Sequence, residues 1–502
     1  IPVANGRFLV NFDAGYCIRD IHFPALGKDN HTDGHKFRFG IWSEGEFDWI
    51  ESWEPRLRYA ADTMESDVRA SSEALEVELA CRDVVDHEEN IFIRKIELHN
   101  WAGRRRELRL FFHHDFNIFG TTSGDTAYYD PDEKAVIHYK KDCYFLISGI
   151  RNGAQGIDQY ATGVKEFRGL EGTWRDAEDG RLEGNPIAQG PVDSTICLSV
   201  EAEAGATETL YYWICAGTDY TEVSRLNKMI LGHGVEHFRG RTINYWRAWL
   251  KTEHLDFDGL SQRAEDLYRA GLIILRTNID SQGAIIAGHD SDIRAYAGDS
   301  YGYMWPRDGA LTAYALSLAG YEAIPRRFFE FCLGIMTRGK ESVSGCFLHK
   351  YNSDGSLGSS WHPWVGGGGK KILPIQEDST ALVIWALWAH FSKYRDAEFA
   401  VDQCEKLVTR CGDFLAGYRD AETGLPLPCY DLWEERWGIH TFTVAAIHGG
   451  LTAAARFADY FGDSRRRRIY ERAAAETKSA AEEHLYDAAS GRYVKSLLIG
   501  DD

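Results

Sequence analysis

The stretch 431–437 places two adjacent carboxylates, Glu434 and Glu435, between the indoles of Trp433 and Trp437. A carboxyl held against an indole is poorly solvated and keeps its proton more readily, as a general acid must. Carboxylates are mostly exposed in proteins, so this pattern alone favours solvated loop charges beside buried tryptophans. The general-acid interpretation therefore depends on what the rest of the chain supplies.

A second group of chemically useful residues lies at 298–308, directly before a predicted helix. Arg307 carries a fork-shaped donor, and Asp308 is an acceptor that can also cap the helix. Together they suit the hydroxyls of a sugar, with Trp305 or Tyr301 as a stacking face. Taken alone, an Arg–Asp pair at a helix start is better explained as a structural ion pair.

A third loop, 360–379, contains four consecutive glycines at 366–369. The Gly-Lys-Ser/Thr of a P-loop and its preceding strand are absent, so we exclude a nucleotide site and expect a loop that moves over a cleft. The Gly-x-Ser-x-Gly, His-Glu-x-x-His and Gly-x-Gly-x-x-Gly motifs are also absent. The remaining combination of carboxylates, aromatic faces and an Arg–Asp pair suits glycoside hydrolysis.

Composition limits the class of protein and of partner. With 502 residues, the chain is long enough for at least two large domains. A net charge of −20 argues against a nucleic-acid partner. The sequence contains no stretch of 18 apolar residues, so no membrane span is predicted. Ten cysteines occur without a Cys-x-x-Cys pair, which argues against a zinc site and predicts buried free thiols in a cytoplasmic protein.

Hydrophobic patterning divides the chain into a β-rich and an α-rich part. Residues 1–221 predict an antiparallel β-sandwich, because short alternating runs recur between Gly, Asp and Asn turns. The expected strands are 7–12, 75–79, 91–98, 107–113, 144–150, 195–200 and 209–215. Residues 222–259 predict a helical linker, since apolar residues return there at helical intervals.

Residues 260–502 have the period of amphipathic helices and form the predicted catalytic domain. The expected helices are 261–278, 308–319, 324–337, 378–392, 397–418, 443–461 and 464–485. Long linkers between paired helices commonly carry function, and the loops described above lie in or beside such linkers.

Three motifs resemble the glucoamylase family, glycoside hydrolase family 15. They are Tyr-x-Tyr-x-Trp-x-Arg-Asp at 301–308, Gln-x-Asp at 376–378 and Asp-Leu-Trp-Glu-Glu at 431–435. Their order and approximate spacing also fit, and the resemblance covers essentially the whole chain. A β-sandwich followed by helices is similar to the prokaryotic branch, which implies a C-terminal (α/α)6 toroid.

The resemblance implies a role for each matched residue. Glu434 corresponds to the general acid and Glu435 to a neighbouring carboxylate that binds sugar hydroxyls. Arg307 and Asp308 match the pair that holds the terminal glucose. The remaining substrate-binding matches are Tyr301, Trp305, Leu432 through its main chain, and Trp433.

The chain departs from the family pattern in two places. Ile372 stands where fungal members have a Trp, so Trp361 or Trp364 is expected to supply that stacking face. The family inverts configuration, which requires a second carboxylate roughly 6.5–9.5 Å from the acid as the base. In the family this base lies late in the toroid, in a motif with Glu-Gln, and no such motif follows Glu435 here. Seven predicted helices are also too few for a full toroid, so we expect the base outside this chain and a toroid that is incomplete here.

The sequence thus predicts an exo-acting, inverting hydrolase that releases β-glucose from an α-linked glucoside and needs no metal or other cofactor. The substrate could be an α-1,4-glucan, an α-1,6-linked dextran or trehalose, as for a glucoamylase, glucodextranase or trehalase. The alternatives are a glucosyltransferase of the same family, or a carbohydrate-binding or regulatory protein that keeps the glucose pocket without chemistry. The oligomeric state is not predicted.

Overall fold

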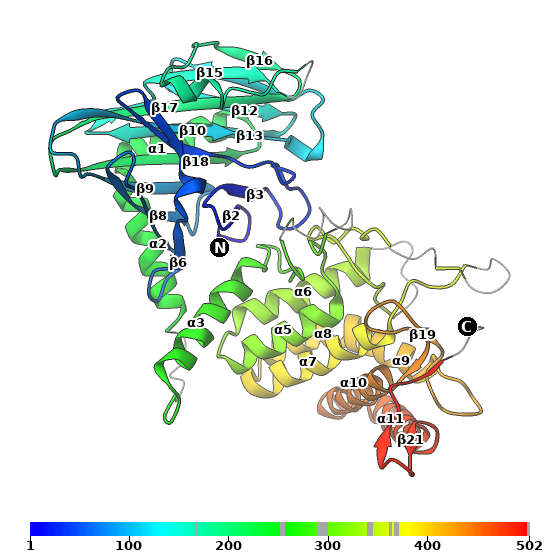
Figure 1. Ribbon diagram of the computed structural model, residues 1–502. Coiled ribbons are helices and arrows are strands. Elements are labelled where there is room, and N and C mark those ends of the chain that lie inside the picture. The colour runs from blue at the N-terminus through cyan, green and yellow to red at the C-terminus, as the bar shows by residue number, and fades with distance from the viewer. Residues whose placement is uncertain are drawn as a thin grey trace. The chain divides into compact units, whose positions relative to one another are not determined.

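The computed structural model describes residues 1–165, 169–251, 257–289, 291, 300–338, 345–360, 364–365 and 371–498. The chain forms two compact units, one of residues 1–281 with 289–301 and one of residues 282–288 with 302–502. Sheets dominate the first unit and helices the second (Figure 1). The predicted domain boundaries at residues 221 and 260 stay predictions.

Two large antiparallel sheets form the first unit. The smaller sheet has the order β15 (Gln159–Val164), β17 (Val192–Ala202), β10 (Arg106–His114), β4 (Phe39–Ser43) and β5 (Glu46–Trp49). The larger sheet has the order β16 (Ile187–Gln189), β11 (Thr126–Asp130), β12 (Ala135–Lys140), β13 (Cys143–Arg151), β18 (Thr207–Gly217), β9 (Ile91–Asn100), β8 (Val77–Val85), β7 (Ser66–Ser72) and β6 (Arg56–Tyr59), with β14 (Ala154–Gln155) beside β13. A further sheet joins β1 (Pro2–Ala4), β2 (Leu9–Phe12) and β3 (Ile18–His22).

The two large sheets pack face to face through aromatic side chains. Phe112 of β10 stacks on Tyr212 of β18 with ring centroids 4.4 Å apart. On its other face, the larger sheet is covered by α1 (Tyr220–His233) and α2 (Val235–Trp249), whose apolar residues pack around the buried Trp213. These helices occupy the predicted linker region, and α1 begins where the Asp219 side chain accepts the Glu222 N–H at 2.9 Å.

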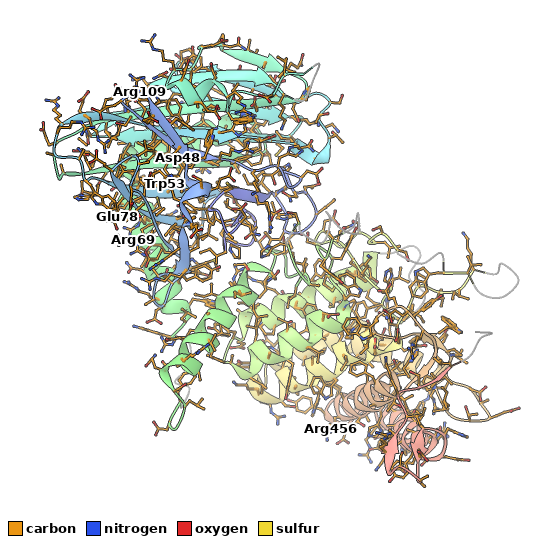
Figure 2. The ribbon with its side chains drawn as sticks, viewed as in Figure 1. Asp48, Trp53, Arg69, Glu78, Arg109 and Arg456 are labelled. Atoms are coloured by element: carbon orange, nitrogen blue, oxygen red, sulfur yellow. The ribbon has the colours of Figure 1, made fainter. Side chains whose placement is uncertain are left out.

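Charged side chains lie on several strands of the first unit, among them Asp48 on β5, Arg69 on β7 and Glu78 on β8 (Figure 2). Arg69 lies on β7 and Glu78 on β8, near the end of the larger sheet that finishes at β6. The edge strand β6 carries two exposed arginines, Arg56 and Arg58. Charged residues on an edge strand hinder pairing with another chain.

Helices build the second unit, and α3 (Gln262–Thr277) precedes them at the end of the first. The second unit contains α5 (Pro306–Leu318), α6 (Ala323–Arg338), α7 (Glu377–Tyr394), α8 (Ala397–Gln403), α9 (Thr409–Gly417), α10 (Thr441–Tyr460) and α11 (Ser464–His484). Helix α7 packs between α5 and α10, and α10 also packs against α11. A π-helical turn, Cys404–Val408, separates α8 from α9, so the helix predicted at 397–418 is interrupted.

Short strands absent from the prediction lie beside these helices. Strands β19 (Cys429–Tyr430), β20 (Trp437–His440) and β23 (Ser496–Leu498) form one small sheet, and β21 (Tyr486–Asp487) pairs with β22 (Arg492–Tyr493). The prediction of an antiparallel β-sandwich followed by helices is confirmed. Within the described ranges, no helix is both long and apolar enough to cross a membrane.

Candidate active site

The β19–β20 hairpin holds Glu434 in a strained turn. Glu434 has a φ of 58°, a left-handed conformation that costs energy for a residue with a side chain. The Asp431 carboxylate braces the turn by accepting the backbone N–H groups of Glu435 at 2.9 Å and Arg436 at 3.3 Å. The Glu434 N–H donates to the Asp431 carbonyl at 2.9 Å. Strain held in this way fixes the direction of the Glu434 side chain.

The Glu434 carboxyl is only 4% exposed and lies against an indole, that of Trp305. Trp305 Nε1 donates to Glu434 Oε1 at 3.3 Å, and Trp305 is itself buried. His349 Nε2 lies 4.0 Å from Glu434 Oε2. The sequence neighbour Trp433 is 70% exposed, so the indole that contacts Glu434 comes from a distant part of the chain.

Helix α5 places Arg307 and Asp308 in its first turn. Pro306 starts the helix, where its fixed φ suits the first helical position. Arg307 is 8% exposed, and its Nη1 donates to Gln376 Oε1 at 3.0 Å. The same Nη1 lies 3.5 Å from Asp378 Oδ1, and Nη2 lies 3.3 Å from Asp308 Oδ2. The Asp308 side chain is 48% exposed, so it presents a carboxylate at the surface of the cluster.

Gln376 links Arg307 to the turn that carries Glu434. Its Nε2 donates to the Asp431 carbonyl at 2.6 Å, while its Oε1 accepts from Arg307. One side chain thus ties the start of α5 to the β19–β20 hairpin. We call Arg307, Asp308, Gln376, Asp378 and Asp431 the Arg307 cluster.

The first turn of α7 buries two carboxyls, that of Asp378 within the Arg307 cluster and that of its sequence neighbour Glu377. Burial raises the pKa of Asp378 above its ordinary value, although Arg307 opposes that shift. Burial raises the pKa of Glu377 to about 7, although the Cys429 thiol opposes that shift. Glu377 is therefore a proton-holding group next to the Arg307 cluster.

A buried His-Lys pair lies beside Trp305. Lys350 is fully buried, with Nζ 4.2 Å from the Tyr303 ring centroid and 5.2 Å from that of Trp305. Two backbone hydrogen bonds between Met304 and Tyr351, at 2.8 and 2.9 Å, hold this segment against the residues that lead into α5. Neither His349 nor Lys350 was predicted, because only the tertiary fold brings His349 to Glu434 and Lys350 to Trp305.

The structure brings together only some of the predicted site residues. Trp305, Arg307, Asp308 and Glu434 meet as described, and Trp364 is buried with its ring 5.3 Å from that of His349. Leu432 is partly buried, and Trp433 and Glu435 are exposed on the same turn as Glu434. Tyr301 belongs to the first unit and is 40% exposed. Trp361 and the glycines at 366–369 lie outside the described residues.

Gln376 and Asp378 belong to the Gln-x-Asp motif, and Asp431 opens the Trp-Glu-Glu stretch, but none was predicted as a site residue. The motifs marked these three positions in the sequence, but a motif does not show which side chains its residues contact in the fold. Among the residues that the structure describes, no group of three or more His, Cys, Asp or Glu side chains is arranged to hold a metal ion.

Comparisons with known proteins show which proteins this chain is similar to. Residues 262–496 match the family model described as glycosyl hydrolases family 15. An uncharacterized glycosyl hydrolase of Methanocaldococcus jannaschii is 22% identical over 460 residues, which cover 90% of this chain and 68% of that protein. An isomaltose glucohydrolase of Kribbella flavida is 27% identical over 207 residues, which cover 38% of this chain and 47% of that protein.

A crystal structure of a bacterial glucoamylase in complex with acarbose has the same fold. Its TM-score is 0.71 at 15% identity, and the match covers 95% of this chain and 65% of that one. The chain thus spans about two thirds of the length of this structure and of the archaeal relative.

Proposed function

This chain belongs to glycosyl hydrolase family 15, a family of glycoside hydrolases, and from that premise we propose that it releases β-glucose from the non-reducing ends of α-linked glucosides with inversion. The observation that carries the proposal is the buried Glu434 carboxyl, fixed by a strained turn and by the Trp305 indole.

We assign Glu434 the role of general acid. A general acid must lie within hydrogen-bond reach of the leaving oxygen and in one orientation. The Asp431-braced turn and the bond from Trp305 supply that orientation. Glu434 then donates a proton to the glycosidic oxygen as the bond to the terminal glucose breaks. A second carboxylate activates the water that attacks from the opposite face.

Arg307 and Asp308 are proposed to bind the terminal glucose. Arg307 is held in place by Gln376 and Asp378, so its guanidinium is oriented before a sugar arrives. The half-exposed Asp308 carboxylate accepts hydroxyl protons from the sugar. Positioning of this kind lowers the entropic cost of reaching the transition state.

The exposed residues of the Glu434 turn are proposed to meet the rest of the substrate. The Trp433 indole offers a face for a sugar ring, Glu435 offers a carboxylate, and Leu432 offers its carbonyl. The roles of Tyr301 and Trp364 stay predictions. We propose that the bond cleaved, between the terminal glucose and the next unit, is an α-1,4 bond, an α-1,6 bond or the α-bond of trehalose.

The proposed setting is a reducing compartment such as the cytoplasm. All nine cysteines whose side chains the structure describes are buried thiols outside any disulfide. Buried thiols persist where glutathione and thioredoxin keep them reduced.

The test is Glu434→Gln in the whole protein, with Glu483→Gln as the control, because Glu483 is exposed on α11. Glucose release from maltose, isomaltose, dextran and trehalose is followed together with the anomer by polarimetry. Glu434→Gln is expected to lower kcat by about 10²–10⁴-fold and to leave glucose binding in place, since the amide keeps the Trp305 bond. The control is expected to act like the wild type.

Four results would contradict the proposal. Unchanged kcat in Glu434→Gln removes Glu434 from the mechanism. Release of α-glucose excludes inversion. Glucose binding without turnover of any of the four sugars by the wild type identifies a binding protein, and transfer of glucose to a second sugar identifies a glucosyltransferase.

A further inference from the structure

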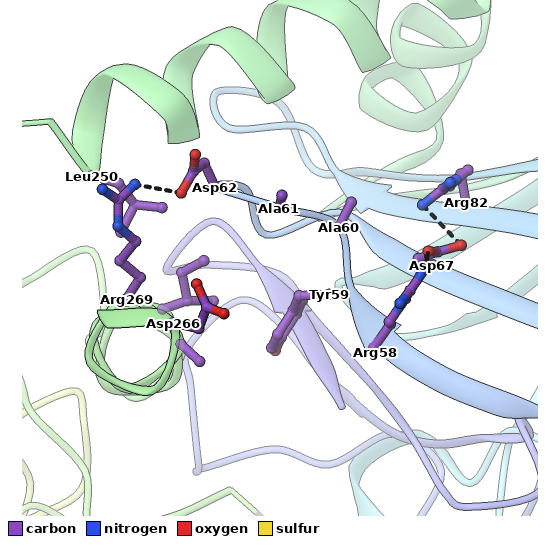
Figure 3. A pocket seen from close by; sticks show the side chains of 12 residues that line it. Arg58, Tyr59, Ala60, Ala61, Asp62, Asp67, Arg82, Leu250, Asp266 and Arg269 are labelled. Carbon is purple, nitrogen blue, oxygen red and sulfur yellow. Dashed lines mark hydrogen bonds and ion pairs between the residues drawn. The ribbon is translucent and has the colours of Figure 1, made fainter. Parts of the chain in front are cut away.

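A pocket with charged ends opens at the free edge of the larger sheet, within the first unit. Its volume is about 530 Å³, inside the roughly 300–1,000 Å³ range of small-molecule sites. It lies beside β6, which ends the larger sheet, and is closed by residues of α3 and the end of α2 (Figure 3). We call it the β6 pocket.

One end of the β6 pocket holds a carboxylate between two arginines. The Asp67 side chain is 7% exposed and lies 2.7 Å from Arg58 Nη2 and 3.0 Å from Arg82 Nη1. The Arg58 side chain contacts Asp67 through Nε and Nη2 and is 77% exposed, so it is accessible to a ligand. Asp67 thus holds both guanidinium groups in fixed directions.

The other end, on the helix side, reverses this arrangement and holds an arginine between two carboxylates. Arg269 of α3 lies 2.5 Å from Asp62 and 2.6 Å from Glu265. Asp266, on the same helix, is exposed at the pocket, where its Oδ1 accepts from Gln262 at 3.0 Å. Figure 3 shows the Asp62–Arg269 pair and the Asp67–Arg82 pair on opposite sides of Ala60 and Ala61.

The middle of the β6 pocket is small and apolar. Ala60 and Ala61 leave space above the backbone, and the Tyr59 ring borders them (Figure 3). The Tyr59 hydroxyl is turned away, donating to the Pro2 carbonyl at 2.5 Å. A flat apolar patch between two polar ends suits a ring that is apolar on its face and polar at its rim.

The charges that line the β6 pocket identify the class of ligand. Three arginines and three aspartates line it, so their formal charges cancel. This balance disfavours a phosphate, which needs an excess of positive charge, and a metal ion, which needs an excess of carboxylate. It favours a neutral molecule with many hydroxyls, each able to donate to a carboxylate and to accept from a guanidinium.

We propose that the β6 pocket is a second, non-catalytic carbohydrate site that binds a segment of the α-glucan substrate. The assignment to a sugar comes from the pocket itself, while the choice of an α-glucan rests on the proposed function. A bound segment raises the effective concentration of the remaining chain ends for the active site. Long substrates therefore gain from the pocket, whereas disaccharides do not.

The test combines a pocket variant with a matched control. Arg58→Ala with Asp266→Asn removes one donor and one acceptor from opposite ends, and both side chains are exposed enough for the fold to tolerate the change. Arg56→Ala with Asp142→Asn is the control, because Arg56 lies on the same strand outside the pocket and Asp142 lies on an exposed turn. Melting temperatures of both variants are expected to match the wild type.

Binding is measured by titrating maltoheptaose and dextran into the whole protein carrying Glu434→Gln, which is expected to slow turnover by about 10²–10⁴-fold. We expect two sites per chain, and the pocket variant is expected to weaken one of them by about tenfold or more. In the protein with Glu434 intact, the pocket variant raises KM for dextran and leaves kcat and the KM for isomaltose unchanged. The control changes none of these values.

Two sites of unaltered affinity in the pocket variant would overturn the inference, as would a single site that Arg307→Ala removes. Inorganic phosphate binding at the pocket without sugar binding would overturn it too. A single site that is lost in the pocket variant and kept in Arg307→Ala supports the pocket while contradicting the proposed active site. The two proposals can therefore fail separately.

Discussion

Each unit contains a buried cluster of arginine and carboxylate side chains. The two clusters differ in how far their carboxylates are buried and hydrogen-bonded. In the first unit, Asp83 of β8 is fully buried and accepts three side-chain hydrogen bonds. They come from Arg94 Nε at 2.7 Å, Tyr16 at 2.6 Å and Ser66 at 2.6 Å. The Arg94 guanidinium lies 4.1 Å from the Tyr16 ring centroid and is itself 2% exposed.

The Arg307 cluster of the second unit is open on one side. Arg307 is buried against Gln376 and Asp378, but the Asp308 side chain is 48% exposed. Burial also leaves Asp378 and Glu377 with raised pKa values, whereas in the first unit Asp83 raises the pKa of Arg94 against the effect of burial. The comparison teaches that a closed cluster stabilises a fold, while a cluster with exposed or proton-holding carboxyls can bind and react.

The largest effect on stability is expected from Asp83→Asn. Breaking a buried ion pair leaves Arg94 charged and without its counter-charge, which costs about 3–5 kcal/mol of the free energy of unfolding. Urea unfolding followed by the tryptophans of the first unit measures this loss. Because Asp83 belongs to the β-rich unit, kcat per folded molecule is expected to stay unchanged.

Glu78→Gln is the control, since Glu78 lies on the same strand and is partly exposed (Figure 2). It is expected to change the free energy of unfolding by less than about 0.5 kcal/mol. A loss below about 1 kcal/mol in Asp83→Asn would show that the closed cluster contributes little, and the comparison would break down.

The largest effect on activity outside Glu434 is expected from Arg307→Lys. An ammonium cannot reach Gln376, Asp378 and Asp308 as the planar guanidinium does. We expect kcat/KM to fall about 10²-fold, or about 2.7 kcal/mol of transition-state stabilisation. Arg327→Lys on α6, at an exposed position, is the control. A fall of less than about twofold would show that the sugar does not depend on this cluster.

Periodicity predicted the large elements well, because amphipathic helices and alternating strands report their own burial. The helices predicted at 261–278, 324–337 and 464–485 are observed as α3, α6 and α11 with ends shifted by one residue or less. Short elements gave too little pattern. Neither the hairpin strands β19 and β20 nor the edge strand β6 was predicted, since strands of two to four residues are set by their neighbours.

The candidate site could be predicted only as far as residue type and motif allow. Glu434 and Arg307 stood out by their motifs, and the structure places both in one buried arrangement. The indole at Glu434 is that of Trp305 from a distant part of the chain, whereas its sequence neighbour Trp433 is 70% exposed. His349 and Lys350 carried no local signal, since their proximity to Glu434 and Trp305 depends on loop packing.

Glu377→Gln tests the comparison through the pH dependence of the free energy of unfolding. The pKa of Glu377 is raised to about 7 by burial, so the folded chain holds this proton up to near neutral pH. The unfolded chain loses it near pH 4.3. The stability that this proton contributes is therefore complete below that pH and is lost as the pH rises through 7. Above pH 7 the wild type must bury a carboxylate, whereas the glutamine variant carries no charge.

We expect Glu377→Gln to match the wild type near pH 4 and to be more stable by about 1–3 kcal/mol at pH 8. Thermal unfolding across pH 4–9 measures the difference. Glu398→Gln, at an exposed position on α8, is the control and is expected to run parallel to the wild type. Parallel curves for Glu377→Gln as well would mean that the buried carboxyl does not titrate in this range.

The smallest effect on stability is expected from Trp433→Ala. Trp433 is 70% exposed beside the buried Glu434, so truncation removes little packing and costs less than about 0.5 kcal/mol of the free energy of unfolding. Trp437→Ala in the same hairpin is the matched control. The Trp437 ring lies 5.2 Å from that of Tyr430, and its removal is expected to cost more stability.

Only Trp433→Ala is expected to raise KM, by a few-fold, because an exposed indole at an open cluster is available to a sugar ring. If Trp433→Ala destabilised the protein as much as Trp437→Ala and left KM unchanged, the indole would be a packing residue, and the open side of the Arg307 cluster would lose its proposed contact with substrate.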